Sequence, residues 1–276
     1  MKTHTLTALC GAAVVIASLI TGQGAIAQSL DDPRLTMQVT SSSDPSAPKI
    51  LFVGNSFIYQ AGVGALVAEM IKQGTHRDPK VMQVVAGGFS LEKHWAGGVA
   101  SKLIQQKGPW DYVVLQDQSE MAISNPQSLQ DNAAKFADLA RRNNAKTVLY
   151  ETWSDRARPD LQQTITSVYR DAASNLHAAV VPVGEAFWKT RATYPNIDLY
   201  DRDSHHPSVA GGYLAACMFY SLFTGKSSQG LPSKLMLRNV LLSDLPPVQA
   251  QQLQTIADSV MMKGGLQSSP PSKKQK

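Results

Sequence analysis

Short apolar stretches alternate with longer helical patterns from Lys49 onward, and this alternation constrains the fold more than any other feature of the chain. Strands that alternate with helices form parallel sheets with helices on both faces. We therefore predict an α/β fold with a five-stranded parallel sheet. Val-, Leu- or Ile-rich runs bounded by Gly, Pro or polar residues predict strands at 49–54, 80–85, 111–116, 146–151 and 179–183. Apolar residues at helical spacing predict helices at 60–73, 97–106, 127–143, 159–177, 208–224 and 247–262.

The first 27 residues have the pattern of a secretory signal peptide. A basic start precedes an apolar run over 6–20, and Ala25-Ile26-Ala27 supplies an A-x-A cleavage site. The run is too short to span a membrane comfortably. We therefore expect residues 1–27 to be removed, the mature protein to be periplasmic or secreted, and no stable membrane insertion to remain after cleavage.

The rest of the chain is expected to hold one domain, over residues 48–264, which is long enough for one hydrophobic core. Residues 28–47 are rich in Ser, Asp and Pro and predict an N-terminal arm, and 265–276 predict a disordered basic tail. The segment 225–246 is expected to be a connection. Cys217 is the one cysteine of the mature chain, so it cannot form an internal disulfide, and its apolar surroundings predict a core residue.

Ser56 follows the first predicted strand in the sequence Gly54-Asn55-Ser56. The carboxyl ends of parallel strands border the crevice where open α/β sheets bind ligands. A serine at this position can also be a simple helix N-cap, so Ser56 alone does not define a nucleophile.

A base and an acid for this serine are found together in Asp203-Ser204-His205-His206, after the fifth predicted strand. With two residues between them, Asp203 can accept a hydrogen bond from Nδ1 of His206, so that Nε2 faces the serine. His205 is the neighbouring competitor, and it would point elsewhere if Pro207 fixes the turn.

Hydrogen-bond donors for an oxyanion are expected after the second and third strands. Gly88 begins a Gly-x-Ser pattern, and a glycine lets a backbone N–H approach a ligand closely; Gly87 is one position away. Gln116 and Gln118 follow the third strand, and a side-chain amide can also donate to an oxyanion.

In order and spacing, these segments resemble the SGNH (GDSL-type) hydrolase superfamily over most of residues 49–224. The resemblance implies a flavodoxin-like three-layer α/β/α fold. It also implies a Ser-His-Asp triad and an oxyanion hole made of the serine N–H, the glycine N–H and an amide side chain. Asn55 stands where the family usually has Asp, and Gln118 where it has Asn, so Gln116 remains an alternative donor.

We therefore expect an exported serine esterase acting on a small-molecule or glycan ester, such as a small acyl ester or an acetylated carbohydrate. An O-acetyltransferase or a non-catalytic envelope glycan-binding protein on the same scaffold are the alternatives. Trp153, after the fourth strand, is a candidate substrate contact near the rim of the crevice or, equally, a half-buried packing residue. Gln116 is also a candidate substrate contact. A metal site at Asp201, Asp203, His205 and His206 is the least favoured reading, because the cluster is too local to set a three-ligand geometry.

Cofactors and nucleic acids are not expected. The chain lacks His-Glu-x-x-His, paired cysteine ligands and a complete dinucleotide fingerprint, so we predict no metal and no cofactor. The net charge is +5, but part of it lies in the C-terminal tail, and no basic face is interleaved with aromatic residues.

Overall fold

The central sheet has five parallel strands and one antiparallel strand at its edge, in the order β1-β3-β2-β4-β5-β6. We analysed a computed structural model, which describes residues 35–263. The parallel strands are β2 (Lys49–Gly54), β3 (Lys80–Val85), β4 (Tyr112–Leu115), β5 (Lys146–Tyr150) and β6 (Ala179–Val181). All five predicted strands are thus confirmed, in the order typical of flavodoxin-like folds. The predicted signal peptide and basic tail lie outside the described residues.

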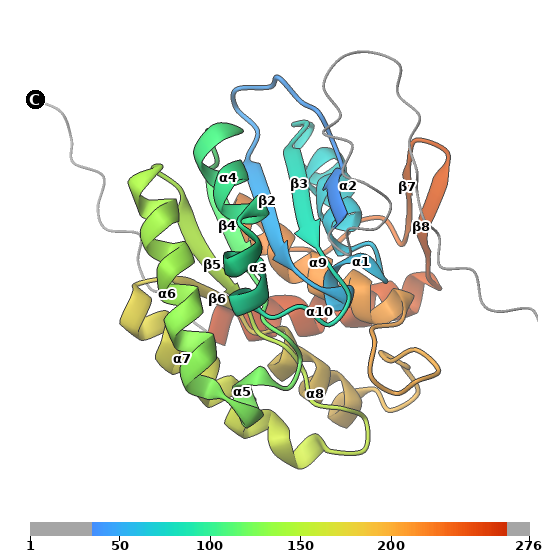
Figure 1. The fold of residues 1–276 in the computed structure, drawn as a ribbon. Helices are drawn as coiled ribbons and strands as arrows, with labels where there is room; N and C mark the ends of the chain where they lie inside the picture. The colour runs from blue at the N-terminus through green and yellow to red at the C-terminus, as the bar shows by residue number, and fades with distance from the viewer. Residues whose placement is uncertain (1–34, 264–276) are drawn as a thin grey trace, which may run out of the picture. The chain divides into compact units, whose positions relative to one another are not determined.

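The sheet is covered on both faces, because successive side chains of each strand point to opposite sides. In β2, Ile50 and Phe52 belong to one hydrophobic cluster, and Leu51 and Val53 belong to the other. The first cluster packs against the layer of α2 (Val63–Thr75), α8 (Val183–Thr193), α9 (Val209–Thr224) and α10 (Pro247–Lys263). The second packs against α3 (Leu91–Gly97), α4 (Val99–Gln106), α6 (Pro126–Arg142) and α7 (Gln162–Leu176), which follows a short 3-10 turn, η1 (Pro159–Leu161) (Figure 1).

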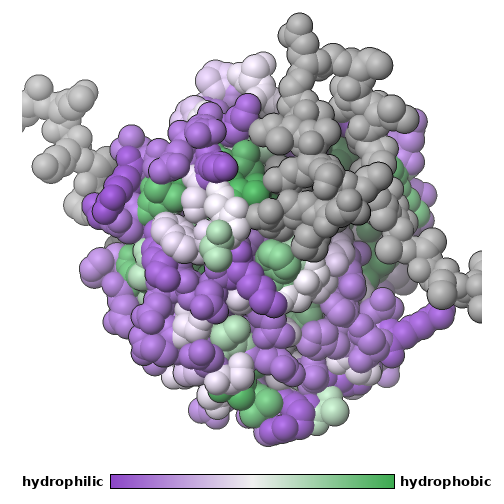
Figure 2. All heavy atoms as spheres, in the orientation of Figure 1, coloured by the Kyte–Doolittle hydropathy of each residue, from purple (hydrophilic) through white to green (hydrophobic). Residues whose placement is uncertain are grey.

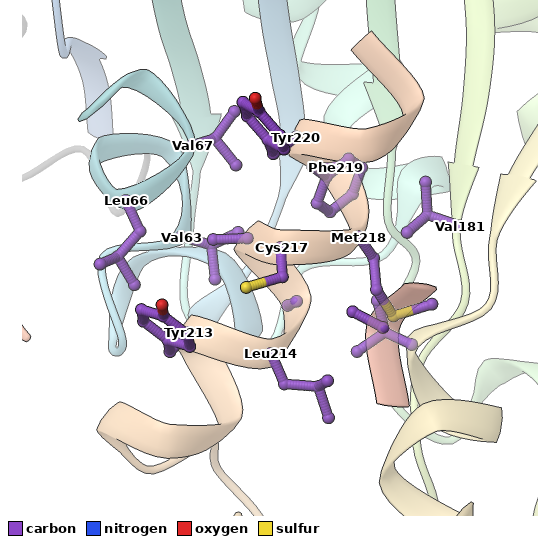
Figure 3. Packing of buried hydrophobic residues seen from close by; sticks show 14 of the residues in the cluster. Val63, Leu66, Val67, Val181, Tyr213, Leu214, Cys217, Met218, Phe219 and Tyr220 are labelled. Atoms are coloured by element: carbon purple, nitrogen blue, oxygen red, sulfur yellow. The ribbon is translucent and has the colours of Figure 1, made fainter. Parts of the chain in front are cut away.

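Helix α9 forms the centre of the first layer. All residues from Ala210 to Tyr220 are buried, as expected for a helix that is apolar all round. Cys217 is fully buried, on the side of α9 that faces Val63 of α2 (Figure 3). Burial raises the pKa of its thiol, so Cys217 is a core residue, as predicted.

Several elements were not predicted. β1 (Leu35–Gln38) lies inside the expected N-terminal arm and pairs with β3, and β7 (Lys234–Leu237) and β8 (Val240–Asp244) form a hairpin inside the expected connection. Besides α8, three short helices were also missed: α1 (Ser56–Tyr59), α3 and α5 (Met121–Ser124). Each of these helices has only four to seven residues, which is too short for a helical period to be recognised.

Helix α8 lies between β6 and the segment that carries Asp203 and His206, where the sequence predicted only a loop. Residues 203–206 were expected in the loop that follows the fifth strand, but α8 and the segment 194–202 come between that strand and these residues. The apolar run of β6 continues into Val183 at the start of α8, so the sequence reads as one longer strand. The segment that carries Asp203 and His206 therefore enters the site from the end of a helix, not from the end of a strand.

Within residues 35–263, no helix is both long and apolar enough to cross a bilayer. On the face drawn in Figure 2, hydrophobic residues form small groups separated by hydrophilic ones.

Candidate active site

Ser56 lies where β2 ends and α1 begins. Asn55 has extended backbone angles and caps the helix, because its side-chain oxygen accepts a hydrogen bond from the Phe57 N–H at 3.1 Å. Ser56 is therefore the first residue of α1, and its own N–H has no acceptor within the helix. Both the hydroxyl and the amide of Ser56 are thus placed at the carboxyl edge of the sheet, and the residue is 8% exposed.

His206 and Asp203 complete a hydrogen-bonded chain with this serine. Nε2 of His206 lies 2.9 Å from Oγ of Ser56, and Nδ1 of His206 lies 2.5 Å from Oδ2 of Asp203. The other carboxylate oxygen of Asp203 accepts hydrogen bonds from the N–H groups of His205 and His206, at 3.0 and 2.9 Å. The three predicted side chains are therefore brought together, although 150 residues separate Ser56 from His206.

Asp203 is held in its ionised form. Burial raises its pKa, but the hydrogen bonds from the His206 ring and from the two backbone N–H groups outweigh burial and lower the pKa to about 2. A negative charge next to Nδ1 keeps the proton on that nitrogen, so Nε2 is the acceptor that faces Ser56.

The shape of the loop explains why the Asp-x-x-His spacing works. Tyr200 and Pro207 form an isolated β-bridge that closes the loop, and the Asp201 N–H donates to the His206 carbonyl at 2.8 Å. At its tip Ser204 has a left-handed backbone, with φ of +62°. The turn thereby folds the carboxylate back toward the imidazole two residues beyond that tip.

An aromatic stack packs against the loop that carries Asp203 and His206. Phe57, the residue after the serine, stacks on Trp153 with ring centres 4.2 Å apart, and it also contacts the rings of His205 and His206. Trp153 stacks on Phe187 on its other face and donates its indole N–H to the His205 carbonyl at 3.0 Å. Trp153 is only 2% exposed, so it positions the histidine loop, and the expectation that it contacts substrate is not supported.

Asn55 connects the turn that carries Ser56 to the loops after β3 and β4. Its amide nitrogen donates to the carbonyl of Phe89, in the glycine loop, at 3.1 Å and to the carbonyl of Asp117 at 3.3 Å. An ionised aspartate has no proton to donate, so it could not make these two bonds. The replacement of the usual Asp by Asn therefore has a structural role in this chain. In the glycine loop, Gly88 is exposed and has φ of +66°, a conformation that favours glycine.

The two glutamines after β4 lie in different environments. Gln116 is fully buried, accepts the Asn55 N–H at 3.0 Å, and donates to the Asp117 carbonyl. A side chain on Gly54 would collide with it, since a Cβ there would lie 2.5 Å from Oε1 of Gln116. Gln116 therefore braces the turn that carries Ser56, and this buried position supports neither a substrate contact nor an oxyanion donor. Gln118 is partly exposed and donates to Oγ of Ser119 at 3.2 Å.

Asp117 fixes the backbone between these glutamines. One of its oxygens accepts the N–H groups of Leu91, at the start of α3, and Gln118, at 2.8 and 2.7 Å. Burial raises the pKa of Asp117 to about 6, and the two backbone hydrogen bonds only partly offset burial. The carboxyl group links the third-strand loop to the glycine loop.

A second chain of Ser, His and Asp lies beside the first and was not predicted. Nδ1 of His205 is hydrogen-bonded to the Asp155 carboxylate, and Nε2 of His205 lies 3.3 Å from Oγ of Ser119. Asp155 comes from the loop after β5, which also binds the histidine loop through the Arg156 N–H and the Ser204 carbonyl at 3.0 Å. No spacing in the sequence indicates this chain, because its members come from three separate loops.

His205 is paired with Asp155 and His206 with Asp203, so each histidine of the predicted cluster has an aspartate partner. Among residues 35–263 no group of three or more His, Cys, Asp or Glu side chains is arranged to hold a metal ion.

Comparison with known proteins identifies the fold. No protein-family model matches the sequence. No curated protein matches it either. Among solved structures, a Slackia heliotrinireducens protein provisionally described as an SGNH hydrolase is 25% identical, with a TM-score of 0.55 over 65% of this chain and 100% of that one. A DUF4886 family protein from Bacteroides uniformis is 17% identical, with a TM-score of 0.60 over 79% of this chain and 95% of that one. An acetyl xylan esterase is 16% identical, with a TM-score of 0.51 over 61% of this chain and 96% of that one.

The protein therefore has the SGNH (GDSL-type) hydrolase fold, a three-layer α/β/α sandwich around a parallel sheet.

Proposed function

We propose that the protein is an exported serine esterase that cleaves carboxylic esters through an acyl-enzyme, with Ser56 as nucleophile. The observation that carries this proposal is the continuous hydrogen-bonded chain from Oγ of Ser56 through His206 to Asp203. A serine hydroxyl is a weak nucleophile, and it needs a base within hydrogen-bond reach that is itself oriented by a third group. The SGNH hydrolase fold supports the same reading.

The steps follow from this geometry. Oγ of Ser56 attacks the ester carbonyl while Nε2 of His206 takes the hydroxyl proton, and Asp203 stabilises the imidazolium that forms. The tetrahedral oxyanion receives hydrogen bonds from the N–H groups of Ser56 and Gly88 and from the Gln118 amide. His206 then gives its proton to the leaving alcohol. Water then attacks the acyl-serine while Nε2 of His206 takes a proton from that water. His206 returns this proton to Oγ of Ser56 as the carboxylic acid is released.

Gly88 and Gln118 are proposed as oxyanion donors for different reasons. Gly88 is exposed beside the nucleophile turn, with a backbone bend that turns its loop toward Asn55. Gln118 keeps its amide at the partly exposed side of the third-strand loop, whereas Gln116 is fully buried below Gly54. Gln118 is therefore the better candidate of the two.

A small acyl group on an alcohol or a carbohydrate is the proposed substrate class. One solved structure of the same fold is an acetyl xylan esterase, which makes acetylated glycans the first substrates to test. Export is proposed from the signal-peptide pattern of residues 1–27. Acetylated polysaccharides outside the cytoplasm would then be accessible to the mature protein.

A panel of p-nitrophenyl acyl esters tests the proposal with the mature chain and Ser56→Ala. The native protein should hydrolyse short acyl esters, and Ser56→Ala should lower kcat by at least about 10³-fold. A fluorophosphonate probe should label the native protein at Ser56 and leave the variant unlabelled. Acyl transfer to a glycan without release to water would instead select the acetyltransferase. Glycan binding without either reactivity would contradict an enzymatic role.

A further inference from the structure

The second Ser-His-Asp chain ends on the side chain that we propose as the oxyanion donor. Oγ of Ser119 lies 3.3 Å from Nε2 of His205 and 3.2 Å from the amide nitrogen of Gln118. The ring of His205 is bound on its other side by Asp155. A continuous row of hydrogen-bonding groups therefore runs from Asp155 to Gln118.

The direction of each hydrogen bond follows from the donors available. A carboxylate only accepts hydrogen bonds, so Nδ1–H of His205 donates to Asp155, and Nε2 of a neutral ring is left as an acceptor. The Ser119 hydroxyl then donates a hydrogen bond to Nε2. Its oxygen keeps lone pairs for the Gln118 amide, which has protons only to give.

The amide of Gln118 is held at both ends by this arrangement. Its Oε1 accepts the Glu120 N–H at 2.9 Å, while its nitrogen donates one proton to Ser119. A primary amide carries a second proton on the same nitrogen, and that proton remains for a substrate oxygen. Glutamine also has one more rotatable bond than the asparagine usual in this family, so it needs more support to hold one orientation.

We propose that Asp155, His205 and Ser119 are positioning residues that fix the Gln118 amide for the developing oxyanion. This inference rests on the proposed ester hydrolysis, and it assigns three side chains that the Ser56 triad does not use. The row would act before the reaction begins, since a donor that is already oriented need not reorganise when charge develops.

Ser119 is not proposed as a second nucleophile, although it is 7% exposed and so nearly as accessible as Ser56. Its oxygen already accepts a hydrogen bond from the Gln118 amide. Within residues 35–263, the hydroxyl of Ser56 is hydrogen-bonded to His206 alone. Ser56 also begins a helix, where its own N–H is open to an oxyanion.

A double-mutant cycle on Ser119 and Gln118 tests the proposal, with kcat and KM measured on p-nitrophenyl acetate. We expect Gln118→Ala to lower kcat about 10²-fold, as for the loss of one oxyanion donor. Ser119→Ala should lower kcat about tenfold and leave KM unchanged, because it acts on the transition state through Gln118. In the Gln118→Ala background, Ser119→Ala should have no further effect. Ser119→Thr keeps the hydroxyl and should restore most of kcat.

Ser124→Ala is the matched control, since the Ser124 hydroxyl donates only to its own helix turn at the Glu120 carbonyl. It should behave as the native protein. Native kcat in Ser119→Ala, or additive losses in the double variant, would overturn the positioning role while the esterase assignment stands. Fluorophosphonate labelling of Ser119 in Ser56→Ala would also overturn it, in favour of a second nucleophile. A native protein without Ser56-dependent activity would overturn both proposals.

Discussion

Two neighbouring histidines each join a serine to an aspartate, yet the two chains differ in how they are built. His206 and Asp203 lie three residues apart in one closed loop, and they reach Ser56 at 2.9 Å. His205 instead joins Asp155 and Ser119, which come from two other loops, and its distance to the serine oxygen is 3.3 Å.

The difference teaches that the three side-chain types do not by themselves define a nucleophile. The backbone around the serine distinguishes the two chains. Ser56 opens α1 next to a buried strand end and has an N–H without a helical acceptor. Ser119 lies in a turn and has its oxygen hydrogen-bonded to Gln118. The set of Ser56, His206 and Asp203 is therefore suited to bond cleavage, and the set of Ser119, His205 and Asp155 is suited to orienting the Gln118 side chain.

Replacing the two histidines one at a time should give the largest contrast. His206→Gln removes the base and should lower kcat by about 10⁴- to 10⁶-fold, as for the loss of a triad member. His205→Gln should lower kcat only about tenfold, because its loss leaves the base in place and loosens one oxyanion donor. Steady-state hydrolysis of p-nitrophenyl acetate measures both. Equal losses from the two variants would show that the chains share one role.

The two aspartates should repeat this contrast at a smaller scale. Asp203→Asn should lower kcat about 10⁴-fold, because an amide at this position favours the wrong tautomer of the imidazole. Asp155→Asn should lower kcat only a few-fold, because Asp155 orients His205, which acts through Ser119 and Gln118 and does not take the proton of Ser56. A larger loss from Asp155→Asn than from Asp203→Asn would reverse the assignment of the two chains.

The hydrogen-bonded set of Ser56, His206 and Asp203 could be predicted from the sequence, because it depends on local spacing. Ser56 follows an apolar run, and Asp203 and His206 are separated by two residues, so both patterns are visible in the chain itself. The fold of the parallel sheet was predictable for the same reason, since each strand is a short apolar run. The structure brings the Ser56 oxygen and the His206 ring to one edge of that sheet, as expected.

The supporting contacts could not be predicted, because they depend on tertiary packing. Ser119, Asp155 and His205 come from three loops, and only the folded chain brings them together. Trp153 follows a strand, and its position in the sequence fits a substrate contact and a packing residue equally well. The closed stack with Phe57 and Phe187 requires the path of α8, which has no clear period in the sequence.

Removal of the Phe57 ring tests whether the aromatic stack serves both histidines. Phe57→Ala should lower the free energy of unfolding by about 3–5 kcal/mol and should also reduce kcat, since the ring contacts His205 and His206. Phe136→Ala is the matched control, because Phe136 is also fully buried but packs against Trp95 on the opposite layer. Urea unfolding and ester hydrolysis should show similar losses of stability and a loss of kcat only in Phe57→Ala. A kcat loss of equal size in both variants would assign the effect to general loosening.

The smallest expected effect concerns Asp117, which holds the backbone N–H of Gln118. Its folded pKa is about 6, above the ordinary value of 3.8, so between these values the folded state binds more protons than the unfolded state. Its contribution to stability is therefore fully present below pH 3.8 and is lost as the pH rises to about 6.

Asp117→Asn keeps an oxygen acceptor for Leu91 and Gln118 and removes the titration. The difference in unfolding free energy between native protein and variant should therefore change with pH, with a slope of at most about 1.4 kcal/mol per pH unit between pH 4 and 6. Thermal or urea unfolding across that range measures the slope. A difference that stays constant would mean that Asp117 has the same pKa folded and unfolded. The carboxylate that anchors the Gln118 loop would then ionise near its ordinary pKa of 3.8, and its ionisation would change little as the pH rises further above that value.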